Sequence, residues 1–127
     1  MNPTPRRDPD ADRTAKVVSK ATARSAAILG LTNAGLAKVI GVSPPTASRL
    51  RDGAYILPFG GKNYELALLL IRLFRWLDAM MGGEEAAAKS WMRTPNLALG
   101  SAPIDRIMSV PGLVEAVAYV DAARARV

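Results

Sequence analysis

The amino-acid sequence predicts an all-α protein, built as an N-terminal helical bundle followed by a small C-terminal helical subdomain. Two observations predict this class. Segments bounded by glycine and proline carry apolar residues three and four positions apart, which is the spacing of one helix face. Half of the 127 residues are hydrophobic but only 6% are aromatic, so the core must consist mostly of Ala, Leu, Ile and Val.

The chain begins with a proline-rich segment and a first helix. Residues 1–12 contain three prolines and charges of both signs, and we expect them to form a disordered tail. From Arg13 to Leu29 the pattern is helical, and this helix opens a domain that spans residues 13–58. Its apolar positions are expected to include Val17, Ala21, Ala27 and Ile28.

The stretch from Leu31 to Gly53 predicts two short helices joined by a tight turn. Thr32 can cap the first helix, Gly41 can end it in the left-handed conformation, and Ser43 can cap the second. Pro44 then occupies the first helical position, where its missing N–H has no cost. Together these features are typical of a helix-turn-helix, which makes this domain a helix-turn-helix bundle.

The open face of the second predicted helix carries short polar side chains and arginines, as a helix that enters a DNA major groove requires. The expected DNA-binding residues are Ser43, Pro44, Thr46, Ser48, Arg49 and Arg51. The charge supports a DNA partner. Residues 1–58 hold nine Lys or Arg and four Asp or Glu, for a net charge of +5, whereas residues 59–127 hold eight and seven, for +1. The alternative is an ordinary helical hairpin with two basic residues on a solvated face.

A connector and a strongly apolar helix occupy residues 59–81. The helix from Tyr64 to Met81 is apolar around most of its circumference, so it needs cover on most sides. This predicts a central core helix or an interface with a second copy or a partner, and both can hold. Just before it, Tyr55, Ile56 and Phe59 are too apolar for a free linker and are expected to pack on a neighbouring element.

Three further helices are predicted in residues 82–127. The first follows Gly82 and Gly83 and ends at about Arg93. A short second helix spans 103–108 and begins with a proline. The last helix has Pro111 in its first turn. One of its faces carries Leu113, Val117 and Val120.

A characteristic series of residues runs through this C-terminal part: Trp91, Asn96, Leu99, Gly100, Pro103 and Gly112. The series resembles the toxin-binding domain of the Xre/MbcA/ParS antitoxins. Ser101 stands where that family usually has a second glycine, a departure that concerns only the local turn geometry. The resemblance covers nearly the whole chain, because these antitoxins also carry an N-terminal Xre-like helix-turn-helix domain.

The resemblance implies a function for each part of the chain. Residues 82–127 would be a toxin-binding domain, and its partner would be a cognate toxin of the RES type, which acts on NAD. Operator DNA would be the partner of the helix-turn-helix. An antitoxin of this kind covers the active site of its toxin and represses the operon that they share, and it is not an enzyme.

The residues of the series have expected structural roles. Asn96 can fix the bend with a side-chain-to-backbone hydrogen bond, Gly100 supplies backbone freedom, and Pro103 starts a helix. Trp91 and Gly112 complete this scaffold. We expect the toxin contacts to come from the final helix and tail, namely Tyr119, Arg124, Arg126 and Val127.

The composition excludes several other classes. Neither cysteine nor histidine is present, which excludes disulfides and histidine acid–base chemistry, and no metal or cofactor is expected. No signal peptide is visible, and the longest apolar run, Leu66 to Ile71, is far too short for a membrane span. We therefore expect a cytoplasmic homodimer that reads two half-sites on DNA and has no membrane partner. The alternative is a stand-alone helix-turn-helix transcriptional regulator with a C-terminal effector or dimerisation domain.

Overall fold

The computed structural model describes residues 8–125, and within them the chain forms seven α-helices and no strand. The helices are α1 (Pro9–Leu29), α2 (Asn33–Ile40), α3 (Pro44–Arg51), α4 (Lys62–Met80), α5 (Glu85–Arg93), α6 (Pro103–Arg106) and α7 (Val110–Ala125). In this range, β-type pairing is limited to one bridge between Asn96 and Ser101. The predicted all-α class is confirmed.

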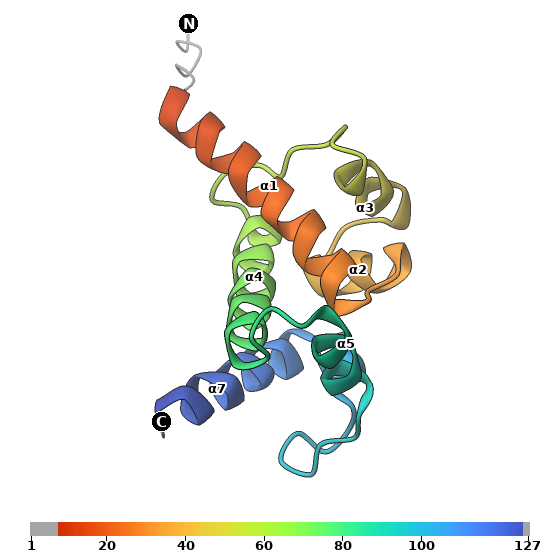
Figure 1. Ribbon diagram of the computed structural model, residues 1–127. Helices are drawn as coiled ribbons and strands as arrows, with labels where there is room; N and C mark the ends of the chain where they lie inside the picture. Colours follow the sequence, from red (N-terminus) through yellow and green to blue (C-terminus); the bar gives the residue numbers. More distant parts are fainter. Residues whose placement is uncertain (1–7, 126–127) are drawn as a thin grey trace, which may run out of the picture.

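Helix α4 lies at the centre of the fold (Figure 1). Helix α1 packs along it, α7 crosses its C-terminal half, and α2 and α5 also contact it. Its buried residues recur at helical spacing: Tyr64, Ala67, Leu70, Leu73 and Leu77. This helix is thus the central core helix that its apolar circumference predicts. Leu68 on its outer side is 42% exposed, and the predicted role of the helix in an interface with a second copy stays a prediction.

Helix α1 differs from expectation at its start and in its buried face. It begins at Pro9 because the Asp8 side chain caps it, so residues 9–12 belong to the helix and not to a disordered tail. The rest of the predicted tail, residues 1–7, lies outside the described residues. Val17 is 63% exposed and Ala27 is exposed, contrary to prediction. The buried face instead includes three hydroxyl side chains: Ser19, Thr22 and Ser25.

These hydroxyls have a hydrogen-bond partner in the interior, because each donates to the carbonyl four residues earlier in α1. They are also small, so α1 can approach its neighbours closely. If Ser and Thr are counted as polar, the sequence therefore predicts a buried face of α1 that differs from the face that is buried in the structure.

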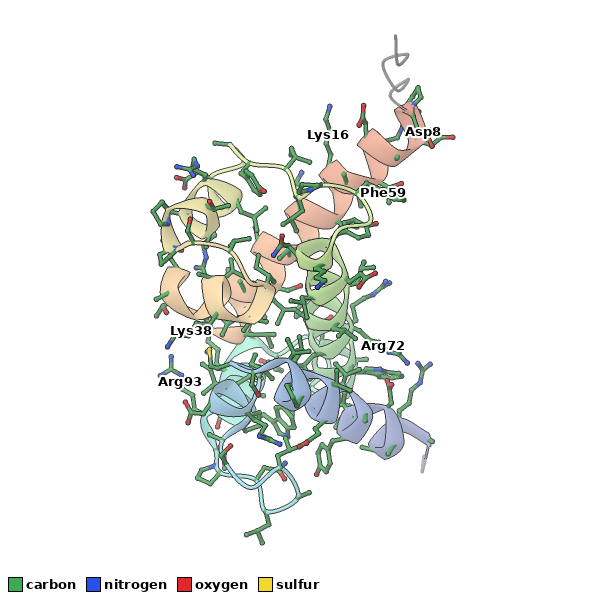
Figure 2. All side chains as sticks on the ribbon, turned by 180° about the vertical axis from the view of Figure 1, so that it is seen from behind. Asp8, Lys16, Lys38, Phe59, Arg72 and Arg93 are labelled. Atoms are coloured by element: carbon green, nitrogen blue, oxygen red, sulfur yellow. The ribbon has the colours of Figure 1, made fainter. Side chains whose placement is uncertain are left out.

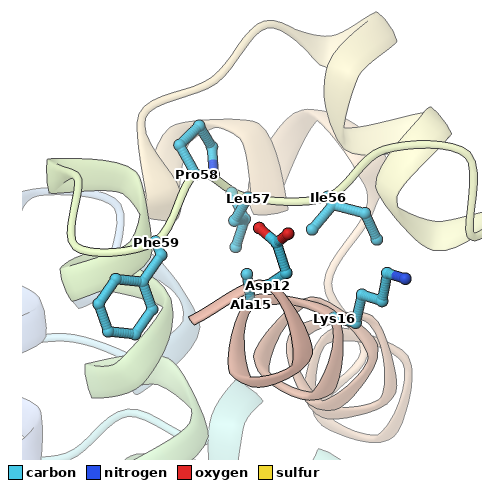
Figure 3. A pocket seen from close by; sticks show the side chains of 7 residues that line it. All are labelled: Asp12, Ala15, Lys16, Ile56, Leu57, Pro58 and Phe59. Atoms are coloured by element: carbon cyan, nitrogen blue, oxygen red, sulfur yellow. The ribbon is translucent and has the colours of Figure 1, made fainter. Parts of the chain in front are cut away.

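The connector between α3 and α4 is anchored mainly by Leu57, and of the three residues that the sequence favoured only Tyr55 is half-buried against the core. Leu57 is fully buried, and its backbone N–H donates to the Ser19 hydroxyl at 2.9 Å. Figure 3 shows the Leu57 side chain directed at α1. Ile56 and Phe59 are 42% and 55% exposed, although the Phe59 ring does contact Tyr64, with 5.2 Å between ring centroids. In an extended segment alternate side chains point to opposite sides, so burying Leu57 turns Ile56 outward.

Candidate nucleic-acid interface and C-terminal motif

The two helices α2 and α3 form the predicted helix-turn-helix, with the predicted caps. The Thr32 hydroxyl accepts from the Gly35 N–H at 3.0 Å, and Gly41 ends α2 with φ +74°. One cap was not predicted. The Asn63 side chain, at the start of α4, donates to the Ile40 and Gly41 carbonyls at 2.7 and 2.9 Å. The turn between the two helices is therefore fixed from outside by α4.

Three predicted DNA-binding residues lie in one hydrogen-bonded row along the outer face of α3. The Ser43 hydroxyl accepts from the Thr46 N–H at 3.3 Å and donates to the Thr46 hydroxyl at 2.9 Å. The Arg49 guanidinium donates to the same Thr46 hydroxyl at 3.2 Å. Buried Ala47 and Leu50 hold the opposite face of α3 against the core. The row is thus ordered in advance, and its end carries the Arg49 guanidinium, which makes no ion pair within residues 8–125.

The other predicted DNA-binding residues of α3 differ in their surroundings. Pro44 is exposed at the first helical position and Ser48 is half-buried. Arg51 turns back into the protein, where its guanidinium donates to the Leu31 carbonyl and its Nε is buried. This burial lowers the pKa of Arg51. Arg51 lies one helical turn after buried Ala47, on the inner flank of α3, so it braces the fold and leaves the predicted DNA-contacting set.

The loop between α5 and α6 is organised by Asn96. Its side-chain oxygen accepts from the N–H groups of Ala98 and Leu99 at 2.9 and 3.3 Å, as predicted. Its backbone closes the loop with three further hydrogen bonds: its carbonyl accepts from Leu99 at 3.2 Å and Gly100 at 2.9 Å, and its N–H donates to Ser101 at 3.1 Å. Gly100 adopts φ +79°, whereas Ser101 has no positive φ. The serine that replaces the usual second glycine therefore causes no backbone strain here.

The contact between the first turn of α7 and the end of α6 requires a glycine at position 112. A Cβ atom built on Gly112 would lie 1.8 Å from the Arg106 carbonyl oxygen, so only glycine allows this close approach of the two backbones. The Gly112 N–H donates to the Ser109 hydroxyl at 3.2 Å. Pro103 is buried and begins α6, which ends at Arg106, two residues before the predicted end at Met108. The scaffold roles predicted for the glycines and the proline agree with this geometry.

The predicted toxin-contact residues lie at the outer face and end of α7. The Tyr119 ring stacks on Trp91, with 6.4 Å between centroids and 25° between ring planes. Trp91 is only half-buried, so this predicted scaffold residue also forms part of the surface. The Arg124 guanidinium lies 3.8 Å from the Trp76 ring centroid. The two other predicted contacts, Arg126 and Val127, lie outside the described residues.

A second group of side chains, which the sequence did not single out together, ties the end of α7 to α4. Asp121 forms an ion pair with Arg72 at 2.8 Å and accepts from the Trp76 indole N–H at 2.5 Å. The same indole ring carries Arg124 on its face. No sequence signal predicts these contacts, because the partners are 45 to 49 positions apart. The group fixes the direction in which the C-terminal end leaves the fold.

A helix-turn-helix with an ordered polar row on α3 is followed by a separate helical motif built on Asn96 and Gly112, an arrangement typical of a DNA-binding domain joined to a second domain. Two family models match the chain: the antitoxin Xre-like helix-turn-helix domain over residues 8–72, and the antitoxin Xre/MbcA/ParS C-terminal toxin-binding domain over residues 77–126. The first match spans more than half of the chain, which therefore belongs to the Xre-like helix-turn-helix antitoxins. No curated protein matches the sequence.

The matches place the junction between the two domains inside α4, between residues 72 and 77. The helix-turn-helix match extends beyond the predicted domain at 13–58 and into residues 59–72 of the predicted connector and central helix. Among residues 8–125, no helix combines the length and the hydropathy that crossing a membrane demands. The protein is an antitoxin by family, with DNA and a toxin as the partners that its two domains imply.

Proposed function

We propose that this antitoxin inhibits a toxin of the RES type by covering its active site, and that it represses its own operon by binding DNA through α3. The observation that carries the proposal is the coexistence in one chain of the Ser43–Thr46–Arg49 row and the loop and turn built on Asn96 and Gly112. The two family matches support the same pairing of functions.

The DNA-binding step depends on Arg49. Its guanidinium is exposed, makes no ion pair among the described residues, and is held by Thr46 in line with the helix start. A bidentate arginine contact to a base is worth about 1–3 kcal/mol, so Arg49→Ala should weaken operator binding by that amount. Gel shifts at matched salt test this. Wild-type affinity in Arg49→Ala would remove Arg49 from the interface.

The toxin-binding step is assigned to the outer face and tail of α7. In this proposal Arg124, Arg126 and Val127 reach the active site of the toxin. Two truncations separate them: a chain that ends at Ala125 lacks Arg126 and Val127, and one that ends at Ala123 also lacks Arg124. We expect toxin neutralisation in cells to fall in the first and further in the second. Full protection by the shorter chain would refute this assignment.

We further propose that the protein acts in the cytoplasm as a homodimer and has no catalytic activity of its own. Each chain carries one recognition helix, and helix-turn-helix proteins commonly read two half-sites about one turn of DNA apart. The absence of histidine and cysteine from the sequence supports a role in binding rather than catalysis. Light scattering of the purified protein, alone and with its operator, measures the stoichiometry. A monomer in both would contradict the dimer.

A further inference from the structure

Two basic side chains of the C-terminal domain lie beside the helix-turn-helix. Lys89 and Arg93 are one helical turn apart on α5, so they share one face of that helix. A Cβ atom built on Gly30, in the turn between α1 and α2, would lie 3.6 Å from both the Arg93 guanidinium and the Lys89 side chain. Figure 2 shows Arg93 and Lys38 of α2 at the same edge of the molecule. We call Lys38, Lys89 and Arg93 the α2–α5 basic strip.

The strip is positive and unneutralised. All three side chains are exposed, and none forms an ion pair among the described residues. The ion pairs of residues 8–125 are elsewhere, within α1, between α4 and α7, and between α6 and α7. Like charges gathered on one edge repel each other, and this arrangement suits a surface whose partner is a polyanion.

The position of the strip favours the DNA backbone as that polyanion. In a helix-turn-helix the second helix enters the major groove while the first crosses the phosphate backbone. Here the first helix is α2, and it carries Lys38. The strip continues from α2 onto α5, on the edge where Figure 2 also draws α3. The C-terminal domain is held there firmly, since Met108 packs against Gly35 in the first turn of α2, 3.3 Å from a Cβ built on that glycine.

We propose that the α2–α5 basic strip binds DNA phosphates next to the site read by α3, so that the toxin-binding domain itself takes part in DNA binding. This inference rests on the proposed function, because it needs α3 in the major groove. Phosphate contacts carry no sequence information, so the strip would raise the affinity for any duplex and fix the register of the protein on it.

The test uses the full chain and two probes: the DNA upstream of its own gene and a scrambled duplex of the same length. Affinity is measured by fluorescence anisotropy over a series of salt concentrations. Each phosphate contact contributes about 0.9 to the slope of log affinity against log salt. Lys89→Ala/Arg93→Ala should therefore lower this slope by about 1.8 for each bound protomer on both probes, which is about 3.6 for the proposed homodimer. Lys38→Ala, on a different helix, should lower it by about 0.9 for each protomer.

The matched control is Arg24→Ala/Arg75→Ala. These arginines are also exposed and lie in the groove between α1 and α4. Replacing both removes the same charge as Lys89→Ala/Arg93→Ala. An equal slope in the control and in the strip variant would mean that only net charge matters, and would overturn the proposal. An unchanged slope in both strip variants would overturn the proposal too. This holds even if those variants bind the toxin more weakly.

The design separates this inference from the proposed function. If the wild-type protein does not distinguish its own upstream DNA from the scrambled duplex, and Arg49→Ala changes nothing, then DNA reading by α3 fails. If Arg49→Ala loses that preference while the strip variants keep the wild-type slope, only the strip fails. Thermal unfolding of each variant ensures that the comparison is made on folded protein.

Discussion

The sharpest stability prediction concerns Gly112→Ala. The added Cβ atom would lie 1.8 Å from the Arg106 carbonyl oxygen and 2.8 Å from its carbonyl carbon. Contacts of this kind do not occur below about 3 Å, so α6 and α7 must separate by roughly 1.2 Å or more. The obstructing atoms belong to the backbone and cannot change rotamer. The cost should therefore reach the upper end of the range for overpacking, about 3 kcal/mol.

Thermal unfolding measures this cost. For a chain of this length, a loss of about 3 kcal/mol corresponds to a fall in Tm of roughly 10 °C. The control is Gly60→Ala, which unlike Gly112 sits at a positive φ, +76°, but has no atom within 4 Å of the added Cβ. That variant should lose only about 1 kcal/mol, from the left-handed conformation alone. If the two variants fall equally in Tm, the close approach of α6 and α7 does not set the requirement for glycine.

Three further predictions test individual contacts. Asn96→Ala removes the acceptor of two loop N–H groups and should cost about 1–2 kcal/mol in urea unfolding, while Asn96→Asp keeps an acceptor and should cost less; equal losses would contradict the role of the oxygen. Asp121→Asn loses only the half-exposed ion pair with Arg72 and should cost under about 1 kcal/mol of stability. Asp121→Ala also removes the acceptor of the Trp76 indole N–H and should cost more. The reverse order of the two losses would refute this. Arg51→Ala should lower the free energy of unfolding by about 1–3 kcal/mol, because the Leu31 carbonyl loses its donor. It should weaken DNA binding less than Arg49→Ala does. Unfolding and anisotropy measurements on both variants check this, and an equal loss of DNA affinity would contradict it.

The sequence predicts those features that depend on neighbouring residues. The caps by Thr32 and Ser43 and the loop bond of Asn96 each join atoms at most three positions apart, so local chemistry decides them. The left-handed glycine at position 41 belongs to the same class, since it needs only a helix that must end.

Contacts between segments that are distant in the sequence could not be predicted without knowledge of the fold. Ser19 meets the Leu57 N–H across 38 positions, and Asn63 caps α2 across 23. Arg51 shows the same limit, because an arginine beside Arg49 has the composition of a DNA contact, and only the position of the Leu31 carbonyl turns it inward. The residues of the proposed interface are thus predictable as a set. Which of them point outward to DNA, and which bind groups inside the protein, is not predictable from the sequence.

The position of α4 has a consequence for how the protein is removed. The junction between the two matched domains falls within this helix, whose buried residues face α1 and α2 as well as α7. A protease that cuts α4 would therefore open the core of both domains at once, and no fragment would keep one of them intact. Loss of the helix-turn-helix fold and loss of the C-terminal fold would then follow a single turnover rate, because within residues 8–125 the two matched domains meet inside a helix and not at a linker.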